Sequence, residues 1–199
     1  MITNKPNQQE QIRLLRSKLI HQEHVPERLL MTSTRGGEGK TTVASALGAS
    51  LAAINCKTIV VHADLRERKE EAEMAHEKGL SDFLSGKLSK DQLIKQGEVG
   101  SNDVIHAGTA TPFSTELLEG GAFHDLMEEL KEAYDMVIVD GPPVIQVSDS
   151  IPLMAICDAA VLAVEHQKTR EDEVLDVSKQ LQNYDVKVLG AVMTKVKSF

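Results

Sequence analysis

Residues 32–48 read TSTRGGEGKTTVASALG. Glycines at positions 36, 37 and 39 stand directly before a lysine and two threonines. Glycine loses more conformational entropy on folding than any other residue, so a run of glycines is favoured where the backbone must approach another group closely. The adjacent lysine adds a positive charge. We therefore expect this loop to bind an anion, and phosphate fits best.

An apolar run precedes the loop and a helical pattern follows it. RLLMTST at 28–34 is typical of a buried strand, and residues 43–54 carry apolar side chains at three- and four-residue spacing. Strand, glycine loop and helix in this order are the context of a P-loop, where backbone N–H groups and the helix N-terminus hold phosphate. The strict pattern GxxxxGK[ST] would place glycine at position 34, where this chain has Thr34. The sequence thus predicts a deviant P-loop.

The lysine and the first threonine of this loop have separate expected roles. The helix is predicted to begin near Lys40, whose side chain should be exposed in the empty loop and reach the terminal phosphates. Thr41 is expected to ligate magnesium. A glycine-rich turn with a chance GKT match is the alternative, and the strand before it and the helix after it argue against that alternative.

Two aspartates follow apolar runs elsewhere in the chain. DMVIVDGPP ends its apolar run at Asp140, and TIVVHADLR leads to Asp64 and Arg66. Ligands bind outside the carboxyl ends of strands in open α/β sheets, so an aspartate there can hold magnesium, or its water, beside the P-loop. A helix cap or a turn is the alternative role for Asp140.

The remaining pattern predicts an α/β fold. Further apolar runs of strand length occupy 58–64, 135–141, 159–165, 186–194 and, more weakly, 103–108. Continuous apolar strands are buried on both faces, which is typical of a mostly parallel central sheet with helices on both faces. Crossover helices are expected at 43–54, 123–134 and 169–184. We predict one P-loop NTPase domain over residues 1–199, with the charged stretch and short helices of 66–97 outside the sheet core, over one edge.

Composition narrows the classes of partner. The 199 residues include 30 acidic and 22 basic side chains, so the surface should repel polyanions and we expect no nucleic-acid partner. Cys56 and Cys157 lack the spacing of a metal site and fit a reducing cytosol. The polar start has no apolar core of a secretion signal, and no apolar run approaches the length that spans a bilayer. We expect a cytoplasmic protein.

Three motifs in order resemble the bacterial tyrosine kinases (BY-kinases) that regulate capsule and exopolysaccharide export, within the MinD/ParA-like P-loop superfamily. GEGKTT is similar to their Walker A motif, VVHADLR to Walker A′, and VIVDGPP to Walker B. GLSDFLSG, AGTATPFSTELL and CDAAVLAV resemble further family stretches. EQIRLLR at 10–16 is similar to the ExxRxxR helix through which such kinases form rings. The resemblance covers nearly the whole chain.

The resemblance implies a reaction and a site. The reaction is transfer of the γ-phosphoryl group of ATP to a protein tyrosine, with Mg²⁺. The implied catalytic residues are Lys40, Asp64, Asp140 and His62, and the implied metal ligands are Thr41, Asp64 and Asp140. The implied ATP-binding residues are Gly36, Gly37, Glu38, Gly39, Lys40, Thr41 and Thr42. Such chemistry needs mainly positioning and neutralisation of charge, which a lysine, a metal and loop dipoles supply.

The resemblance also implies partners. The protein would act on tyrosines of other proteins and would form a homo-oligomer through an N-terminal helical segment at 1–25. A separate transmembrane activator of the polysaccharide co-polymerase type would bind it. Its place would then be cytoplasmic and peripheral to the membrane through that activator.

Three departures from the family pattern leave alternatives open. Tyr134 and Tyr184 are the only tyrosines, both in predicted structural positions, so we expect no clustered phosphorylation of a C-terminal tail. His62 stands where the family has the first Walker A′ aspartate, which predicts weaker metal support but surviving ATP binding; its imidazole could also accept a proton from a tyrosine hydroxyl. Arg35 stands where MinD and ParA ATPases carry a signature lysine. The alternatives are an ATP-binding regulator without kinase activity and a MinD-like dimerising ATPase.

Overall fold

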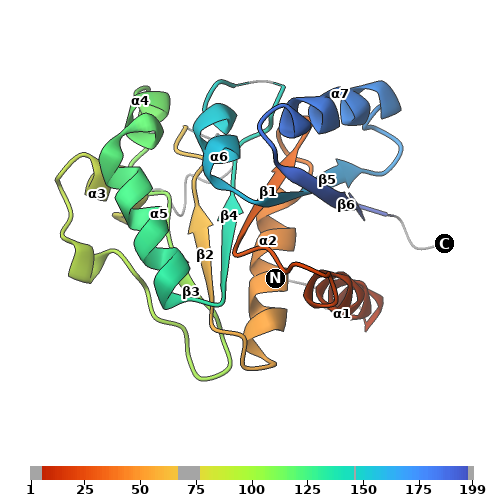
Figure 1. The fold of residues 1–199 in the computed structure, drawn as a ribbon, viewed down its shortest axis with the longest axis horizontal. Coiled ribbons are helices and arrows are strands. Elements are labelled where there is room, and N and C mark those ends of the chain that lie inside the picture. The colour runs from red at the N-terminus through yellow and green to blue at the C-terminus, as the bar shows by residue number, and fades with distance from the viewer. Residues whose placement is uncertain (1–5, 67–76, 146, 197–199) are drawn as a thin grey trace.

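The structure is a computed structural model that describes residues 6–66, 77–145 and 147–196 (Figure 1). Its centre is a six-stranded sheet. The strands are β1 (Arg28–Ser33), β2 (Thr58–His62), β3 (Asp103–Ile105), β4 (Met136–Asp140), β5 (Ala159–Glu165) and β6 (Lys187–Thr194). Each of the six lies in a stretch whose apolar pattern predicts a strand.

The strands run in the order β3-β2-β4-β1-β5-β6, and all pairs between them are parallel. Strand β1 lies between β4 and β5, so the chain leaves β1 for β2 on one side and later crosses from β4 to β5 on the other. The carboxyl end of β1 is therefore the switch point at which open α/β sheets bind ligands. The glycine loop directly follows this end.

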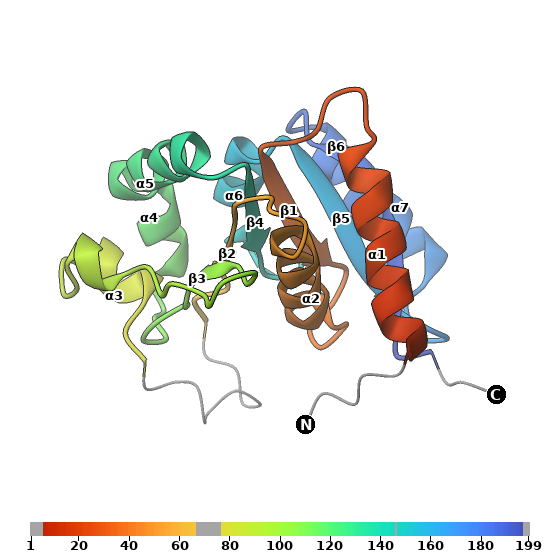
Figure 2. The same ribbon diagram turned by 90° about the horizontal axis from the view of Figure 1, so that it is seen from below.

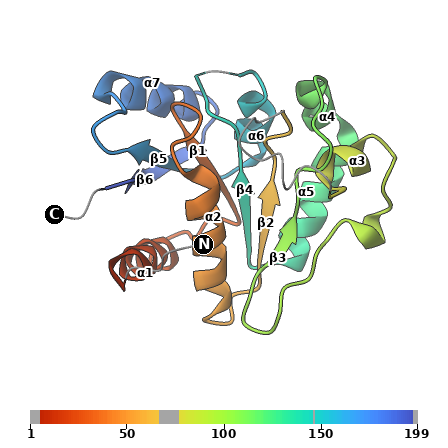
Figure 3. The same cartoon turned by 180° about the vertical axis from the view of Figure 1, so that it is seen from behind.

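Helices occupy both faces of the sheet. They are α1 (Pro6–Ile20), α2 (Lys40–Ala52), α3 (Leu80–Leu84), α4 (Ser114–Glu119), α5 (Gly121–Ala133), α6 (Ser150–Ile156), α7 (Glu171–Gln182) and the short 3₁₀ helix η1 (Lys90–Gln92). Helices α1 and α2 cover one face, which Figure 3 views from the front, and α5, α6 and α7 pack on the other (Figure 2). The three predicted crossover helices are confirmed, with ends shifted by up to three residues.

Alternation along each strand divides the core into two layers. In β1, Leu29 and Met31 join the layer that includes Leu47 of α2, whereas Leu30 points into the opposite layer with Leu126 of α5. These side chains are almost completely buried. A strand that buries both faces needs apolar residues at every position, which explains the continuous apolar runs in the sequence.

The predicted burial of strand β6 on both faces is wrong. The sequence predicts that the 186–194 strand is buried on both faces, but several of its residues are exposed, including Met193 at 59%. The strand order places β6 at an edge of the sheet, and the face that it shares with α1 borders a large groove. Position in the sheet, which a strand's own residues do not encode, decides this exposure.

The short elements between β2 and β3 lie beyond the edge strand β3, as predicted (Figure 1). They still anchor in the core, because Leu80 and Leu93 are fully buried against it. The charged run at 67–76 lies outside the described residues.

Cys56 and Cys157 are both free thiols. Among the described helices, none has the length and apolar character needed to cross a membrane.

Candidate nucleotide site

The glycine loop joins β1 to α2 in a conformation that depends on glycine. Gly37 has φ of 78° and Gly39 has φ of 87°, both in the left-handed region. Side chains with a Cβ atom seldom adopt this region. At Gly39 an added Cβ would also lie 3.3 Å from a methyl carbon of Thr194. Gly39 caps α2, so the loop leads the backbone directly to the N-terminus of that helix, where N–H groups attract anions.

Lys40 is the first residue of α2, as the sequence predicts, but its expected exposure is wrong. The side chain is only 4% exposed. Lys40 follows Gly39 directly, so the lysine stands at the junction of the glycine loop and the helix. A lysine held in this way needs less ordering when it meets a phosphate than a lysine extended into solvent would.

Thr41 and Asp140 meet at the centre of the site. The hydroxyl of Thr41 donates a hydrogen bond of 2.7 Å to Oδ2 of Asp140, which ends β4 and is 1% exposed. The other carboxylate oxygen, Oδ1, is buried and has no hydrogen-bond partner among the described residues. A hydroxyl and a carboxylate oxygen without a partner are oxygen ligands of the kind that Mg²⁺ prefers. These residues therefore fit the predicted metal.

His62 lies against the same carboxylate. Its Nδ1 atom is 2.9 Å from Oδ2 of Asp140, because the sheet register places the two residues side by side. The ring also stacks on His106, with centroids 6.1 Å apart and planes 14° from parallel. Burial lowers the pKa of His106, and the neighbouring His62 and Lys95 act in the same direction against Glu77. The structure thus brings His62, Thr41 and Asp140 together, as the sequence predicts for one site.

Asp64 lies two residues beyond β2 and is half-buried. Its charge acts on Arg66, whose pKa is raised first by the hydrogen bond to Asp149 and also by Asp64. Within the described residues, no group of three or more His, Cys, Asp or Glu side chains could hold a metal ion. Magnesium sites on phosphates commonly use only one or two protein oxygens besides phosphate and water. A metal role for Asp64 stays a prediction.

Sequence reasoning missed the partner of Arg66. Asp149 is fully buried and receives two hydrogen bonds from that guanidinium, from Nε at 2.7 Å and from Nη2 at 2.9 Å. The hydroxyl of Thr115 donates a third at 2.5 Å. Burial raises the pKa of Asp149, but the hydrogen bonds from Arg66 and Thr115 outweigh it, so the pKa lies below its ordinary value. Asp149 stands in VSDS, which carries no signal for this contact.

A groove of about 2340 Å³ connects the site to the face covered by α1. Its polar end is formed by Thr41, His62, Arg66 and Asp140. The rest runs between α1, α2 and the exposed face of β6. Gly39 and Thr42 line the groove beside Thr41, so the groove reaches the glycine loop.

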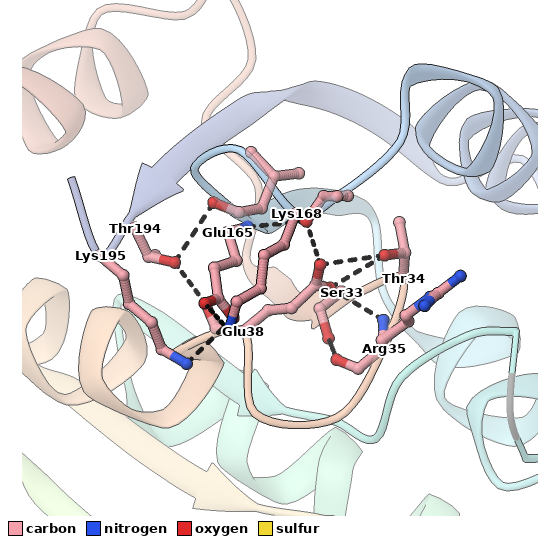
Figure 4. A network of polar contacts seen from close by, with 10 residues as sticks. Ser33, Thr34, Arg35, Glu38, Glu165, Lys168, Thr194 and Lys195 are labelled. Atoms are coloured by element: carbon pink, nitrogen blue, oxygen red, sulfur yellow. Dashed lines mark hydrogen bonds and ion pairs between the residues drawn. The ribbon is translucent and has the colours of Figure 1, made fainter.

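Glu38, predicted as an ATP-binding residue, does not line this groove, and Figure 4 shows its side chain directed toward Thr34 and Arg35. It is 3% exposed, and its carboxylate accepts hydrogen bonds from Thr34, from the backbone N–H of Arg35 and from Thr169. Only the backbone of Glu38 is therefore placed to serve a phosphate. The side chain of Arg35 is paired with Glu173 of α7.

The switch-point loop, the buried lysine and the Thr41–Asp140 pair together define a P-loop nucleotide-binding protein. Comparison with known proteins then places it more narrowly. The sequence pattern of the family described as AAA domain matches residues 27–185. Tyrosine-protein kinase CpsD of Streptococcus agalactiae is 31% identical over 171 residues, which cover 84% of this chain and 75% of that protein.

Solved structures of a tyrosine kinase domain and of a P-loop ATPase are similar to this chain. The kinase domain of the Escherichia coli tyrosine kinase ETK matches with a TM-score of 0.83 at 29% identity, over 96% of this chain and 78% of that chain. The septum site-determining protein MinD of Pyrococcus horikoshii, complexed with Mg-ADP, matches with a TM-score of 0.68 over 84% of this chain and 69% of that chain. At 20% identity it shows the fold alone. The chain belongs to the AAA-domain P-loop family that includes the bacterial tyrosine-protein kinases.

Proposed function

We propose that this chain transfers the γ-phosphoryl group of ATP to tyrosine side chains of proteins, with Mg²⁺. The observation that carries the proposal is the pairing of Thr41 with Asp140 beside the glycine loop, with one buried carboxylate oxygen left without a partner among the described residues. Membership of a family that includes named tyrosine-protein kinases supports the choice of acceptor.

The glycine loop, Lys40, Thr41 and two aspartates have separate roles in the proposed reaction. The backbone of residues 36–42 binds the phosphates through N–H groups and the N-terminus of α2. Lys40 neutralises charge that develops on the transferred group. Thr41 and Asp140 would hold Mg²⁺, which when bound neutralises charge on the phosphate oxygens. Asp64 is proposed as a further carboxylate ligand of the metal, in addition to Thr41 and Asp140.

His62 makes a slow kinase the expected outcome. It occupies the site of a family carboxylate and already contacts Oδ2 of Asp140, so the metal site carries one negative charge fewer. The same contact favours the second candidate function, an ATP-binding regulator without transfer activity. A MinD-like dimerising ATPase would need Arg35 to reach a second subunit, whereas here Arg35 pairs with Glu173 of its own chain.

The proposed setting follows from the family resemblance. The kinase would act in capsule or exopolysaccharide synthesis, on the cytoplasmic side of the membrane, where a separate transmembrane activator of the polysaccharide co-polymerase type binds it. It would assemble with further copies of itself through the N-terminal segment.

Incubation with ATP labelled at the γ-phosphate separates the candidates. Labelled phosphate on an added tyrosine-containing protein, dependent on Mg²⁺ and increased by the activator's cytoplasmic segment, supports the kinase. Binding of ATP without turnover would establish the regulator instead. Release of free phosphate together with ATP-dependent dimerisation would establish the MinD-like ATPase. An Asp140→Asn variant serves as the control, since it removes the negative charge of the proposed metal ligand and keeps the side-chain volume.

A further inference from the structure

The carboxylate of Glu38 is a buried anion within a loop that binds anions, and the proposed reaction makes no use of it. The side chain is 3% exposed and does not line the groove that leads to Thr41 and Asp140. A negative charge near a phosphate site opposes phosphate binding. The carboxylate of Glu38 instead holds neighbouring hydrogen-bond donors of the protein in place.

Three donors surround this carboxylate. Oε2 accepts the backbone N–H of Arg35 at 2.8 Å and the hydroxyl of Thr34 at 3.0 Å. Oε1 accepts a hydrogen bond from the hydroxyl of Thr169, which lies in the segment that joins β5 to α7. A carboxylate only accepts hydrogen bonds, so all three donors are matched, whereas an amide would place a donor against one of them. The contacts close the loop between residues 34 and 38.

Two further bonds join this loop to the ends of β5 and β6. The hydroxyl of Thr169 accepts the N–H of Glu165, the last residue of β5, at 2.8 Å. The hydroxyl of Thr194, the last residue of β6, lies 2.7 Å from the carbonyl oxygen of Glu38. In a trans peptide, C=O and the next N–H point in opposite directions. Fixing the carbonyl of Glu38 therefore also fixes the direction of the N–H of Gly39 in the phosphate loop.

We propose that Glu38 is a positioning residue that, through Thr169, couples the conformation of the phosphate loop to the segment 166–170 and the start of α7. The inference rests on the proposed function insofar as nucleotide occupies this loop. Nucleotide binding then orders the 166–170 segment, which does not line the groove. The start of α7 therefore becomes more ordered when the site is occupied. Arg35 and Glu173 form a parallel contact between the loop and α7.

Hydrogen exchange tests the coupling in the full chain, with Mg-ADP as the probe. In the wild-type protein, Mg-ADP should slow amide exchange in residues 34–42 and in 166–170. In Thr169→Val, which keeps the side-chain shape but lacks the hydroxyl, Mg-ADP should slow exchange only in 34–42, and its affinity should fall about tenfold. Thr169→Ser keeps both hydrogen bonds and is the matched control, with coupling and affinity within twofold of wild type.

Glu38→Gln is a second variant that does not alter the 166–170 segment, and it too should lose the coupling. A purely structural role predicts lower stability to urea in these variants with coupling intact, and that result would overturn the inference. Equal behaviour of Thr169→Val and Thr169→Ser would do the same. Absence of any Mg-ADP effect on 166–170 in the wild-type protein also refutes the coupling, even where tyrosine phosphorylation is observed. Coupling without phosphoryl transfer would instead contradict only the proposed kinase activity.

Discussion

The hydroxyl of Thr41, in the first turn of α2, donates a 2.7 Å hydrogen bond to Asp140 at the end of β4, across 99 residues of sequence. The bond joins the phosphate loop to the neighbouring strand of the sheet. It also orients the carboxylate so that one oxygen faces the hydroxyl and His62 while the other has no hydrogen-bond partner among the described residues.

Replacement of Lys40 by methionine should weaken ATP binding while the fold is kept. Methionine matches the buried stem of the lysine, which is 4% exposed, but carries no charge for the phosphates. A hydrogen bond to a charged group contributes about 1.5–3 kcal/mol, so affinity should fall roughly 10- to 100-fold. Isothermal titration with ATP measures this, and circular dichroism checks the fold. Unchanged affinity in a folded Lys40→Met protein would remove the phosphate-site interpretation.

His62→Asp should raise Mg²⁺-dependent tyrosine phosphorylation of an added substrate. The change restores a carboxylate beside Asp140 and thus adds an oxygen ligand and a negative charge for the metal. Without Mg²⁺ the two carboxylates repel each other, so the variant should also be less stable than wild type in chelator. His62→Asn, which restores no charge, is the control. An unchanged or lower rate in His62→Asp would show that the proposed metal shell is wrong.

Asp149→Asn should destabilise the protein by roughly 1–3 kcal/mol, because it removes the charge of a fully buried carboxylate that pairs with Arg66, whose own side chain is 43% exposed and partly screened by solvent. Hydrogen bonds lower the pKa of Asp149 in the folded state. Its stabilising effect is thus complete above the unfolded pKa of about 3.9 and is lost as pH falls through the lower folded value. Urea unfolding at pH 7 and near pH 3 measures the difference between variant and wild type. A difference that does not shrink in acid would contradict this account.

Arg13 and Arg16, which the family resemblance assigns to one assembly surface, have different surroundings here. Arg13 forms an exposed ion pair with Glu10 at 3.5 Å, whereas Arg16 donates to the backbone oxygen of Ser50 in α2 at 2.8 Å. We expect Arg13→Ala to reduce the assembly size measured by light scattering with the activator segment present. Arg16→Ala should instead lower the thermal stability of the single chain. Unaltered size in Arg13→Ala would assign another role to this helix.

Tyr134 should not be a phosphorylation site in the folded protein. Burial raises the pKa of its hydroxyl, and so does the hydrogen bond of 2.7 Å to Asp103. A phosphate there would meet that carboxylate and disrupt the contact. Mass spectrometry after incubation with ATP should find Tyr134 unmodified, and Tyr134→Phe should cost about 1–2 kcal/mol of stability. Stoichiometric phosphorylation of Tyr134 would refute its structural role.

The strands of the sheet and the glycine loop could be predicted from the sequence alone, and so could the meeting of several polar residues at the carboxyl ends of those strands. These depend on contiguous signals, such as the apolar run of β1 followed by GGEGKTT and the runs that end near His62 and Asp140. Parallel strands bring their carboxyl ends to one edge, so residues that follow several strands meet without further information. The convergence of Thr41, His62 and Asp140 could be predicted for this reason.

Which of these groups are buried, and which residues they contact, depends on the tertiary structure. The strand order left β6 at an edge, half-exposed despite an apolar sequence. Contacts over more than 80 residues gave Arg66 its partner Asp149, and contacts over more than 130 joined Glu38 to Thr169. Such pairs carry no local pattern, because a buried carboxylate is stabilised by donors from whichever elements the packing of the sheet and helices brings beside it.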